Sequence, residues 1–284
     1  MPKDKIFKKF SSCFCCLKCT AKKVVLKPPS PPFYEVLPIE TRPSEYILKM
    51  SSEVDTSGMM KIMKQDVRFI KTTLGNDIVV LFLTCSIRAR YTLIYSHGRS
   101  TDIGQMHSFC AFLSFVTGCD IVTYDYSGYG HSEGKPSEEN LYEDIRAAWN
   151  YALTRPNPEN IILYGQDIGA TATLDLASKV SCAGVILHAP IASTVLVVCY
   201  GKPRSDCISS FNSAEKARKV TCPVLVIHGT NDEVNTLSHG KTLHKLCSRA
   251  VEPLWIQGAA HNNLHVYGQY EERLRKFINE ELSD

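Results

Sequence analysis

Short apolar runs rich in β-branched residues alternate with amphipathic stretches over most of the chain, from Gln65 onward. These runs predict strands at residues 66–73, 78–84, 91–96, 120–124, 161–164, 184–188, 224–228 and 253–256. Helical spacing of apolar residues predicts helices at residues 103–115, 141–153, 170–178, 236–247 and 267–281. The first two strands form a hairpin, and most later strands are followed by a helix. This order predicts an α/β fold with a mostly parallel eight-stranded sheet and helices on both faces.

Composition and charge narrow the class of protein. The chain has 284 residues, of which 44% are hydrophobic and 21% charged, which excludes a wholly disordered chain, a collagen-like repeat and a polytopic membrane protein. The net charge is +3, but residues 1–27 carry eight Lys and one Asp, which leaves −4 for the other 257 residues. A mildly acidic body predicts no nucleic-acid partner. No stretch reaches the ~20 apolar residues of a membrane span, and a signal peptide is not evident, so we expect a reduced, cytosolic protein.

Four of the twelve cysteines lie close together in the basic segment, at Cys13, Cys15, Cys16 and Cys19. Acylation of several such cysteines beside Lys residues would hold a protein stably on an anionic membrane surface. A zinc site is the first alternative, but zinc ligands usually come as two separated pairs around a folded knuckle, and this spacing leaves no room for one. A tail without function is the second alternative. We favour S-acylation, and expect no metal site and no cofactor.

A proline-rich stretch, Pro28-Pro29-Ser30-Pro31-Pro32, follows the basic segment. Its composition predicts a stiff, extended spacer. We therefore expect residues 1–32 to form a membrane anchor with its linker. Residues 33–284 would then form one folded domain.

The most informative motif is Gly165-Gln166-Asp167-Ile168-Gly169, which follows a predicted strand and opens a predicted helix. Its glycines fit the sharp turn that carries the nucleophile of α/β-hydrolases, normally in the pattern Gly-x-Ser-x-Gly. Asp232 follows the strand at 224–228, and His261 follows the strand at 253–256. The order of nucleophile position, acid and His is that of α/β-hydrolases. We therefore predict an α/β-hydrolase fold with Asp167, Asp232 and His261 at one edge of the sheet.

A further element of such a site is an oxyanion hole. The pair His97-Gly98 follows the strand at 91–96, where α/β-hydrolases supply one of their oxyanion donors. The backbone N–H groups of Arg99 and Ile168 are the expected donors.

Several segments resemble the α/β-hydrolase domain-containing protein 17 family: YTLIYSHG at 91–98, DYSGYG at 125–130, LYGQ at 163–166, VLVIHGT at 224–230 and VEPLW at 251–255. That resemblance covers about residues 60–284 and implies a membrane-associated thioesterase that removes palmitate from protein cysteines. It implies Asp232 as the acid and His261 as the base of a Ser–His–Asp mechanism. It also implies S-acylated membrane proteins as partners. The expected location is the cytoplasmic face of membranes, at the plasma membrane and endosomes.

The sequence departs from that family at its nucleophile. The family has Ser where this chain has Asp167, Asn where it has Arg99, and Asp where it has Asn263. A carboxylate that attacks a thioester would give a mixed anhydride, a step uphill from the thioester. Haloalkane dehalogenases and epoxide hydrolases do use an elbow Asp, but they also need a halide-binding Trp or two cap Tyr residues. Residues 190–220 are short for a cap and offer only Tyr200, so we expect a short or absent cap.

Two functional hypotheses follow from these residues. The first is a membrane-anchored thioesterase that acts on palmitoylated proteins. The second is a catalytically inactive relative that binds acyl chains or acylated partners. Asp167 and Asp232 would flank His261, and Arg99 would add a cation, which predicts an ion-pair cluster in place of an open site. Asp167 is then expected to be non-functional as a nucleophile.

Overall fold

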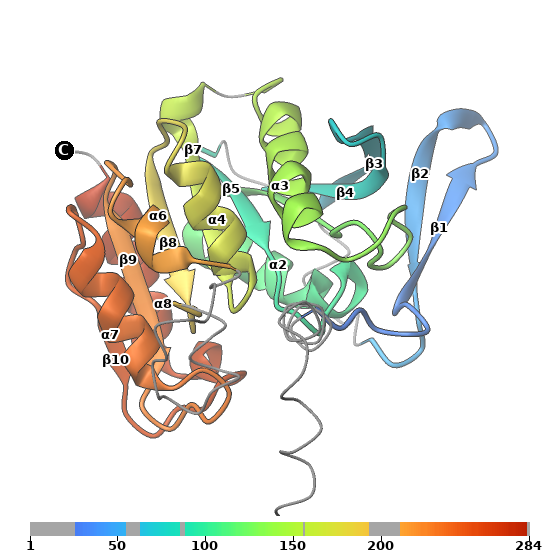
Figure 1. Cartoon of the computed structure of the whole chain (residues 1–284). Coiled ribbons are helices and arrows are strands. Elements are labelled where there is room, and N and C mark those ends of the chain that lie inside the picture. The colour runs from blue at the N-terminus through green and yellow to red at the C-terminus, as the bar shows by residue number, and fades with distance from the viewer. Residues whose placement is uncertain (1–25, 55–62, 86–88, 156, 193–210, 283–284) are drawn as a thin grey trace, which may run out of the picture.

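The computed structural model describes residues 26–54, 63–85, 89–155, 157–192 and 211–282 (Figure 1). Its strands are β1 (Tyr34–Ile39), β2 (Arg42–Met50), β3 (Lys64–Lys71), β4 (Asp77–Thr84), β5 (Thr92–Ser96), β6 (Asp120–Tyr124), β7 (Ile161–Gln166), β8 (Gly184–His188), β9 (Val224–Gly229) and β10 (Leu254–Ile256). Its α-helices are α2 (Ile103–Thr117), α3 (Glu138–Ala152), α4 (Gly169–Ala177), α6 (Ser213–Ala217), α7 (Leu237–Leu246) and α8 (Gly268–Lys276). Short 3-10 helices lie at Pro158–Asn160 and Leu264–Val266, and a π-helical turn at Phe277–Glu281 ends the described chain.

All described strands belong to one sheet, in the order β1-β2-β3-β4-β6-β5-β7-β8-β9-β10. The strands from β1 to β4 pair antiparallel, as do β4 and β6. From β6 to β10 every pair is parallel. The predicted mostly parallel sheet is confirmed, and each predicted strand lies within two residues of an observed one.

The predicted number of strands was wrong, because the described sheet has ten strands and not eight. The two that the sequence pattern missed are β1 and β2, which pair with each other as a hairpin. Only the pair Tyr46↔Val67 joins β2 to β3, and most positions of β1 are half-buried or exposed. The hairpin extends away from the body of the domain (Figure 1). A strand with little buried surface shows little hydrophobic alternation, so its sequence carries no clear strand pattern.

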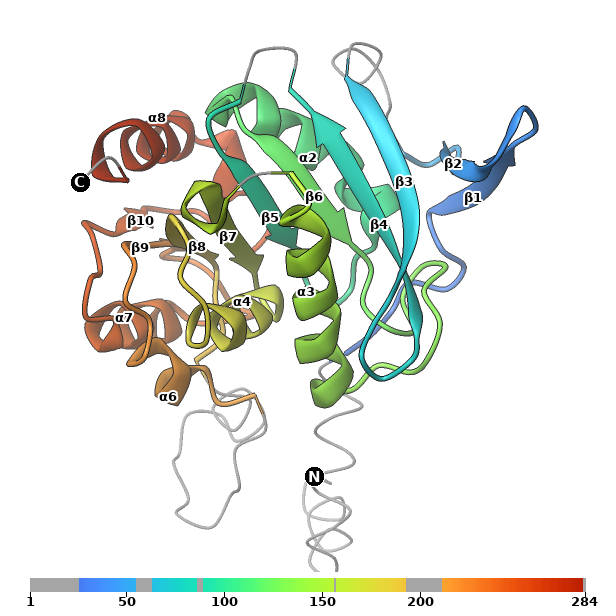
Figure 2. The same ribbon diagram turned by 90° about the horizontal axis from the view of Figure 1, so that it is seen from above.

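Helices cover both faces of the parallel part of the sheet, as expected (Figure 2). One face carries α3, α4, α6 and α7, and the other carries α2 and α8. The central strand β5 supplies both layers. Ile94 belongs to the core cluster that holds Trp149 of α3, whereas Leu93 and Tyr95 belong to the cluster that holds Leu113 of α2. A strand that is buried on both sides reads as a continuous apolar run, which explains why these strands were easy to predict.

The end of the predicted anchor segment packs against the domain. Leu26 is buried in the same core cluster as the α3 face, and the Lys27 backbone N–H donates to the carbonyl of Arg99 at 3.0 Å. The predicted acylated cysteines lie outside the described residues, and so does most of the stretch for which a short cap was predicted. Among the described residues, no helix has the length and apolar character needed to cross a membrane.

A buried carboxylate fastens the β1–β2 hairpin to the rest of the fold. Asp125 follows β6 and is fully buried. Its Oδ2 accepts a hydrogen bond from the Tyr34 hydroxyl at 2.5 Å, and its Oδ1 accepts one from the Ile103 backbone N–H at 2.9 Å. One side chain therefore joins β1, the start of α2 and the loop after β6.

We expect Tyr34→Phe to lower the free energy of unfolding by about 1–3 kcal/mol, because it leaves one oxygen of a buried carboxylate without that donor. Tyr46→Phe is the matched control: its ring packs edge-on against Phe69, and its hydroxyl is not among the groups around Asp125. Chemical denaturation of both variants measures the difference. Equal stability of the two variants would contradict the role given to the Tyr34 hydroxyl.

Candidate active site

The turn between β7 and α4 has the geometry of a nucleophile elbow. Asp167 follows the last residue of β7 and adopts a φ of 55°, in the left-handed region that Asp tolerates better than most residues. The flanking glycines are required by close approach. A Cβ at Gly169 would lie 2.1 Å from the carbonyl oxygen of Ser96, and one at Gly165 would lie 2.5 Å from the Cα of Ala170. The elbow predicted from the sequence is therefore present, with Asp167 at its apex.

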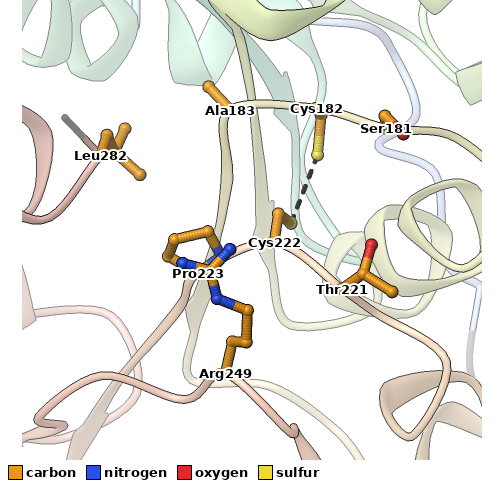
Figure 3. A pocket seen from close by; sticks show the side chains of 8 residues that line it. All are labelled: Ser181, Cys182, Ala183, Thr221, Cys222, Pro223, Arg249 and Leu282. Carbon is orange, nitrogen blue, oxygen red and sulfur yellow. Dashed lines mark hydrogen bonds between the residues drawn. The ribbon is translucent and has the colours of Figure 1, made fainter. Parts of the chain in front are cut away.

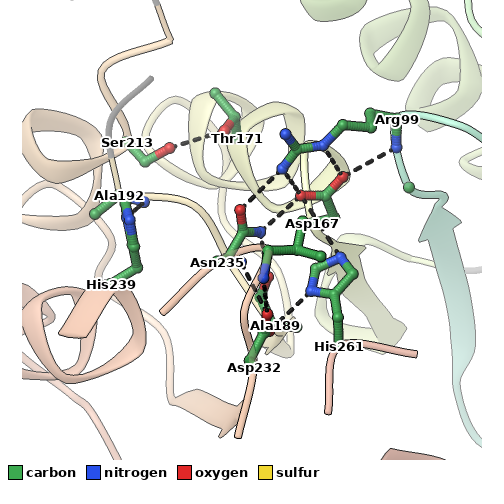
Figure 4. Close-up of polar contacts among 12 residues, drawn as sticks. Arg99, Asp167, Thr171, Ala189, Ala192, Ser213, Asp232, Asn235, His239 and His261 are labelled. Carbon is green, nitrogen blue, oxygen red and sulfur yellow. Dashed lines mark hydrogen bonds and ion pairs between the residues drawn. The ribbon is translucent and has the colours of Figure 1, made fainter. Parts of the chain in front are cut away.

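The carboxylate of Asp167 is held by the side chains of two other loops (Figure 4). Its Oδ2 accepts hydrogen bonds from Arg99 Nε at 2.7 Å and from the Arg99 backbone N–H at 3.1 Å. Its Oδ1 accepts one from Asn235 Nδ2 at 2.7 Å and a short one from Arg99 Nη2. The same Arg99 Nη2 donates to Asn235 Oδ1 at 2.9 Å, which closes the cluster.

This cluster fixes the charge of Asp167. The residue is only 2% exposed, and burial alone would raise its pKa. The hydrogen bonds and positive charge of Arg99 outweigh burial, with smaller contributions from His261 and Asn235, so the pKa of Asp167 is lowered. Burial likewise acts to lower the pKa of Arg99, but the hydrogen bonds and charge of Asp167 raise it overall. The pair is therefore a buried carboxylate and a partly buried guanidinium, both ionised at neutral pH.

His261 and Asp232 form a hydrogen-bonded pair beside this cluster. His261 Nδ1 lies 2.8 Å from Asp232 Oδ2, and the Asn235 backbone N–H donates to Asp232 Oδ1 at 2.8 Å. Burial would raise the pKa of Asp232, but contacts with His228 and His261 dominate and hold it well below its usual range. His261 Nε2 is 4.0 Å from Asp167 Oδ1, which is too long for a hydrogen bond. The structure thus brings the three predicted triad positions together.

The predicted oxyanion donors have a different environment from that of an open hydrolase site. The Arg99 backbone N–H is already bonded to the Asp167 carboxylate. The carbonyl of Arg99 accepts from the Tyr129 hydroxyl at 2.8 Å and from the Lys27 backbone N–H at 3.0 Å. Both the N–H and the carbonyl of Arg99 are therefore held by hydrogen bonds. Ile168 is fully buried at the N-cap of α4. A carboxylate oxygen of Asp167 therefore accepts the hydrogen bond from the Arg99 N–H that the oxyanion of a tetrahedral intermediate would need.

Sequence reasoning missed two residues of this site, Asn235 and His228. Asn235 lies three residues after Asp232 and donates to both Asp167 and the carbonyl of Ala189. His228 is the penultimate residue of β9, and its Nε2 lies 3.2 Å from Asp232 Oδ2. Nothing in the local pattern separates these residues from ordinary loop or strand residues. Their roles depend on side chains that the fold brings from other strands.

The carboxylates and histidines of the site are engaged with one another or with Arg99 and Asn235. Within the described ranges there is no group of three or more His, Cys, Asp or Glu side chains arranged to hold a metal ion. The chemistry that this arrangement offers is therefore that of charges and hydrogen bonds: a buried ion pair, and a His–Asp pair of the kind that activates a nucleophile in hydrolases.

The strand order, the elbow, and the order of Asp167, Asp232 and His261 define an α/β-hydrolase fold. Solved structures agree. The esterase Pf2001 from Pyrococcus furiosus has a TM-score of 0.65 and 15% sequence identity, with 79% of this chain and 96% of that chain covered. The α/β-hydrolase GrgF from Penicillium has a TM-score of 0.64 and 16% identity, with 78% and 100% covered. At these identities the likeness shows the fold alone.

Sequence comparisons give the family. Residues 87–202 match the family described as serine aminopeptidase, S33. The human alpha/beta hydrolase domain-containing protein 17B is 43% identical over 282 residues, which cover 97% of each chain. The mouse alpha/beta hydrolase domain-containing protein 17C is 44% identical over 299 aligned positions, covering 95% of this chain and 93% of its relative. The chain belongs to the alpha/beta hydrolase domain-containing protein 17 family.

The buried ion pair predicts a characteristic dependence of stability on pH. We expect Asp167→Asn to cost about 3 kcal/mol of unfolding free energy at pH 7, because it leaves the partly buried guanidinium of Arg99 without its counter-charge. The folded pKa of Asp167 is lowered, so its contribution is present above the unfolded Asp pKa of about 3.9 and is lost as pH falls through the folded value. The difference between wild type and variant should therefore shrink as the pH falls below about 4.

Denaturant titrations at pH 7 and at successively lower pH measure this difference. Asp77→Asn is the control, because Asp77 forms a surface ion pair with Lys71 in which both side chains are more than a third exposed. Water screens such a pair, and its loss should cost less than about 1 kcal/mol. A cost of Asp167→Asn that stayed constant over this pH range would show that the Asp167 carboxylate is not charged in the folded protein.

Proposed function

We propose that this chain works at S-acylated membrane proteins as a non-hydrolysing member of its family, which binds acylated cysteines or acyl chains without removing the acyl group. The family resemblance supports the substrate class, since it implies proteins that remove palmitate from cysteines. The observation that carries the non-hydrolysing part is the hydrogen-bonded cluster of Arg99, Asp167 and Asn235.

The chemistry of thioester cleavage explains why this cluster opposes catalysis. A Ser-type mechanism needs a hydroxyl that attacks the acyl carbon, a base that takes its proton, and donors that stabilise the oxyanion. Asp167 has no hydroxyl, and both of its oxygens already accept hydrogen bonds from Arg99. The Arg99 backbone N–H, an expected oxyanion donor, is bonded to the same carboxylate. Asp167 therefore removes two parts of the mechanism: it supplies no hydroxyl nucleophile, and its carboxylate occupies the Arg99 N–H that would stabilise the oxyanion.

A second candidate function is hydrolysis by water that His261 activates directly. The hydrogen bond of 2.8 Å between His261 Nδ1 and Asp232 favours it, because this contact orients the ring as in a working triad. In such a reaction His261 Nε2 would take a proton from water as its oxygen attacks the thioester carbon, and the thiol would leave with a proton. The oxyanion would still lack the Arg99 donor, so the geometry favours the non-hydrolysing function.

Membrane anchoring is the remaining part of the proposal. Cys13, Cys15, Cys16 and Cys19 would carry acyl chains, and the neighbouring Lys residues would contact the anionic cytoplasmic surface of the plasma membrane and endosomes. Lys27 joins this segment directly to the site, because its backbone N–H donates to the carbonyl of Arg99. The anchored chain would therefore hold the site close to its acylated partners.

Restoring the hydroxyl tests the non-hydrolysing function. We expect purified wild type to show no fluorophosphonate labelling and no palmitoyl-thioesterase turnover above background, because loss of a triad nucleophile typically costs about 10⁶ in turnover. Asp167→Ser should gain both activities. The double variant Asp167→Ser, Arg99→Asn should gain more, because the single change leaves the Arg99 guanidinium beside the new hydroxyl. Asp167→Ala is the matched control, since it removes the carboxylate without adding a nucleophile.

The outcomes separate the two candidate functions. Turnover of a palmitoyl thioester by wild type that is lost in His261→Ala would establish the water-activating mechanism and overturn the non-hydrolysing one. No activity in wild type, with activity gained in the double variant, would support the proposal. If folded wild type bound neither an acylated peptide nor a non-hydrolysable acyl analogue, the binding role would be wrong.

Membrane fractionation tests the anchor. We expect the wild-type chain to sediment with membranes and to be released by hydroxylamine, which cleaves thioesters. Replacing the four clustered cysteines with Ser should move the chain to the soluble fraction at high salt, because Lys residues alone give only salt-sensitive binding. A control that replaces Lys18, Lys22 and Lys23 with Gln keeps the cysteines and should remain sensitive to hydroxylamine. A quadruple Cys variant that stays on membranes in high salt would place the anchor elsewhere.

A further inference from the structure

Two thiols lie side by side near the amino ends of β8 and β9 (Figure 3). Cys182 precedes β8 and Cys222 precedes β9, and their Sγ atoms are 3.5 Å apart. Both residues are 9% exposed. Because β8 and β9 run parallel, their amino ends meet at one edge and their carboxyl ends, with the elbow and the Asp232 loop, at the other. The pair is thus remote from the site described above.

The two cysteines lie just before the paired parts of two neighbouring strands, a separation of the order that a disulfide spans. The paired register of β8 and β9 begins at Val185↔Val224, and the Val185 N–H donates to the Pro223 carbonyl at 2.9 Å. Neighbouring strands lie about 4.8 Å apart, and disulfides usually join Cα atoms about 4.4–6.8 Å apart. Closing the Sγ–Sγ distance from 3.5 Å to a bond of about 2.05 Å needs mainly side-chain rotation.

We propose that Cys182 and Cys222 form a two-cysteine redox site, which a small disulfide such as glutathione disulfide converts into an intramolecular disulfide. In the first step one cysteine thiolate attacks a sulfur of glutathione disulfide, forms a mixed disulfide and releases one glutathione thiolate. In the second step the other cysteine loses its proton and attacks the sulfur of the first cysteine, and the second glutathione leaves. The two protein thiols are oxidised, and one glutathione disulfide is reduced to two glutathione molecules.

The surroundings of the pair supply access. A cavity of about 210 Å³ is lined by both cysteines and by Arg249. Ser181 and Thr221, which also line it, are exposed, so the cavity reaches solvent at that rim. A small disulfide can therefore approach the pair even though the two cysteines are themselves largely covered.

The charges around the pair determine which cysteine attacks first. The contact with the Cys182 thiol lowers the pKa of Cys222, burial opposes this shift, and a backbone hydrogen bond and the Arg249 charge assist it. The same contact and burial raise the pKa of Cys182. Arg249 also lines the cavity beside the pair, so we expect Cys222 to attack first and Cys182 to resolve the mixed disulfide. Cys247 is a contrasting neighbour, because burial raises its pKa to about 12.

The cross-link would have a measurable effect on the fold. It would close the chain between residues 182 and 222, which contains α6, onto the edge of the sheet. Closing a loop of this length restricts the unfolded chain, so we expect the oxidised protein to melt about 5–10 °C above the reduced protein. The effect does not depend on the proposed function, since neither cysteine touches the residues of the candidate active site.

The test is differential alkylation of the full chain after treatment with glutathione disulfide, followed by tryptic mass spectrometry. A Cys199→Ser background is needed, because Cys199 and Cys182 lie on the same tryptic peptide, residues 180–204. We expect that peptide to be joined to residues 220–241, with loss of two hydrogens in mass and reversal by dithiothreitol. Cys222→Ala should abolish the link and the rise in melting temperature, whereas Cys110→Ala, which removes a fully buried thiol of α2, should keep both.

Several results would overturn the proposal. One is full alkylation of both cysteines after oxidation, and another is a link from Cys222 to Cys247 in place of Cys182. A stable mixed disulfide with glutathione and no internal link would also contradict it, because it would show that Cys182 does not resolve. If Cys222→Ala failed to fold, the peptide map of the unsubstituted pair and its reversal by dithiothreitol would still decide the question.

Discussion

The buried ion pair between Arg99 and Asp167 is the interaction on which the rest of the site depends. A carboxylate that is 2% exposed is costly unless it is paired and hydrogen-bonded, and here Arg99 and Asn235 together supply four donors to its two oxygens. The hydrogen bonds that stabilise this carboxylate include the Arg99 backbone N–H, which is the group expected to bind the oxyanion in a hydrolase. The Asp at the elbow thus engages much of the site, because its partners come from the loop after β5 and from the loop after β9.

The fold determines which groups are available for this pairing. Strands β5, β7 and β9 run parallel and end at the same edge, so the loops that carry Arg99, Asp167 and Asn235 meet there whatever their side chains are. The tight contact of Gly169 with Ser96 then fixes how far the apex of the elbow projects. Backbone geometry of the hydrolase kind is therefore compatible with either a nucleophile or an ion pair at residue 167.

How much the sequence could predict follows from where its signal comes from. The sequence predicted strands that are buried on both faces, such as β5, because burial permits few residue types. It also predicted the elbow, because close backbone approach there permits only Gly at two positions. The β1–β2 hairpin was not predicted, since its positions are largely half-buried or exposed, and Tyr34 is bound through Asp125, 91 residues away. Asn235 was missed for the same reason. Its partners Arg99 and Asp167 are 136 and 68 residues distant, and no local pattern encodes a contact of that range.

Asp232 and His261 also have structural roles at this site. Asp232 is buried, and it accepts a hydrogen bond from the backbone N–H of Asn235, the residue that holds Asp167. Replacing Asp232 would therefore disturb the loop that satisfies the buried carboxylate, with or without any reaction at the site. His261 in turn contributes to the lowered pKa values of both Asp232 and Asp167. Both residues therefore help to hold the Asp167 carboxylate and its loop in place, which gives them a structural role that is independent of any reaction at the site.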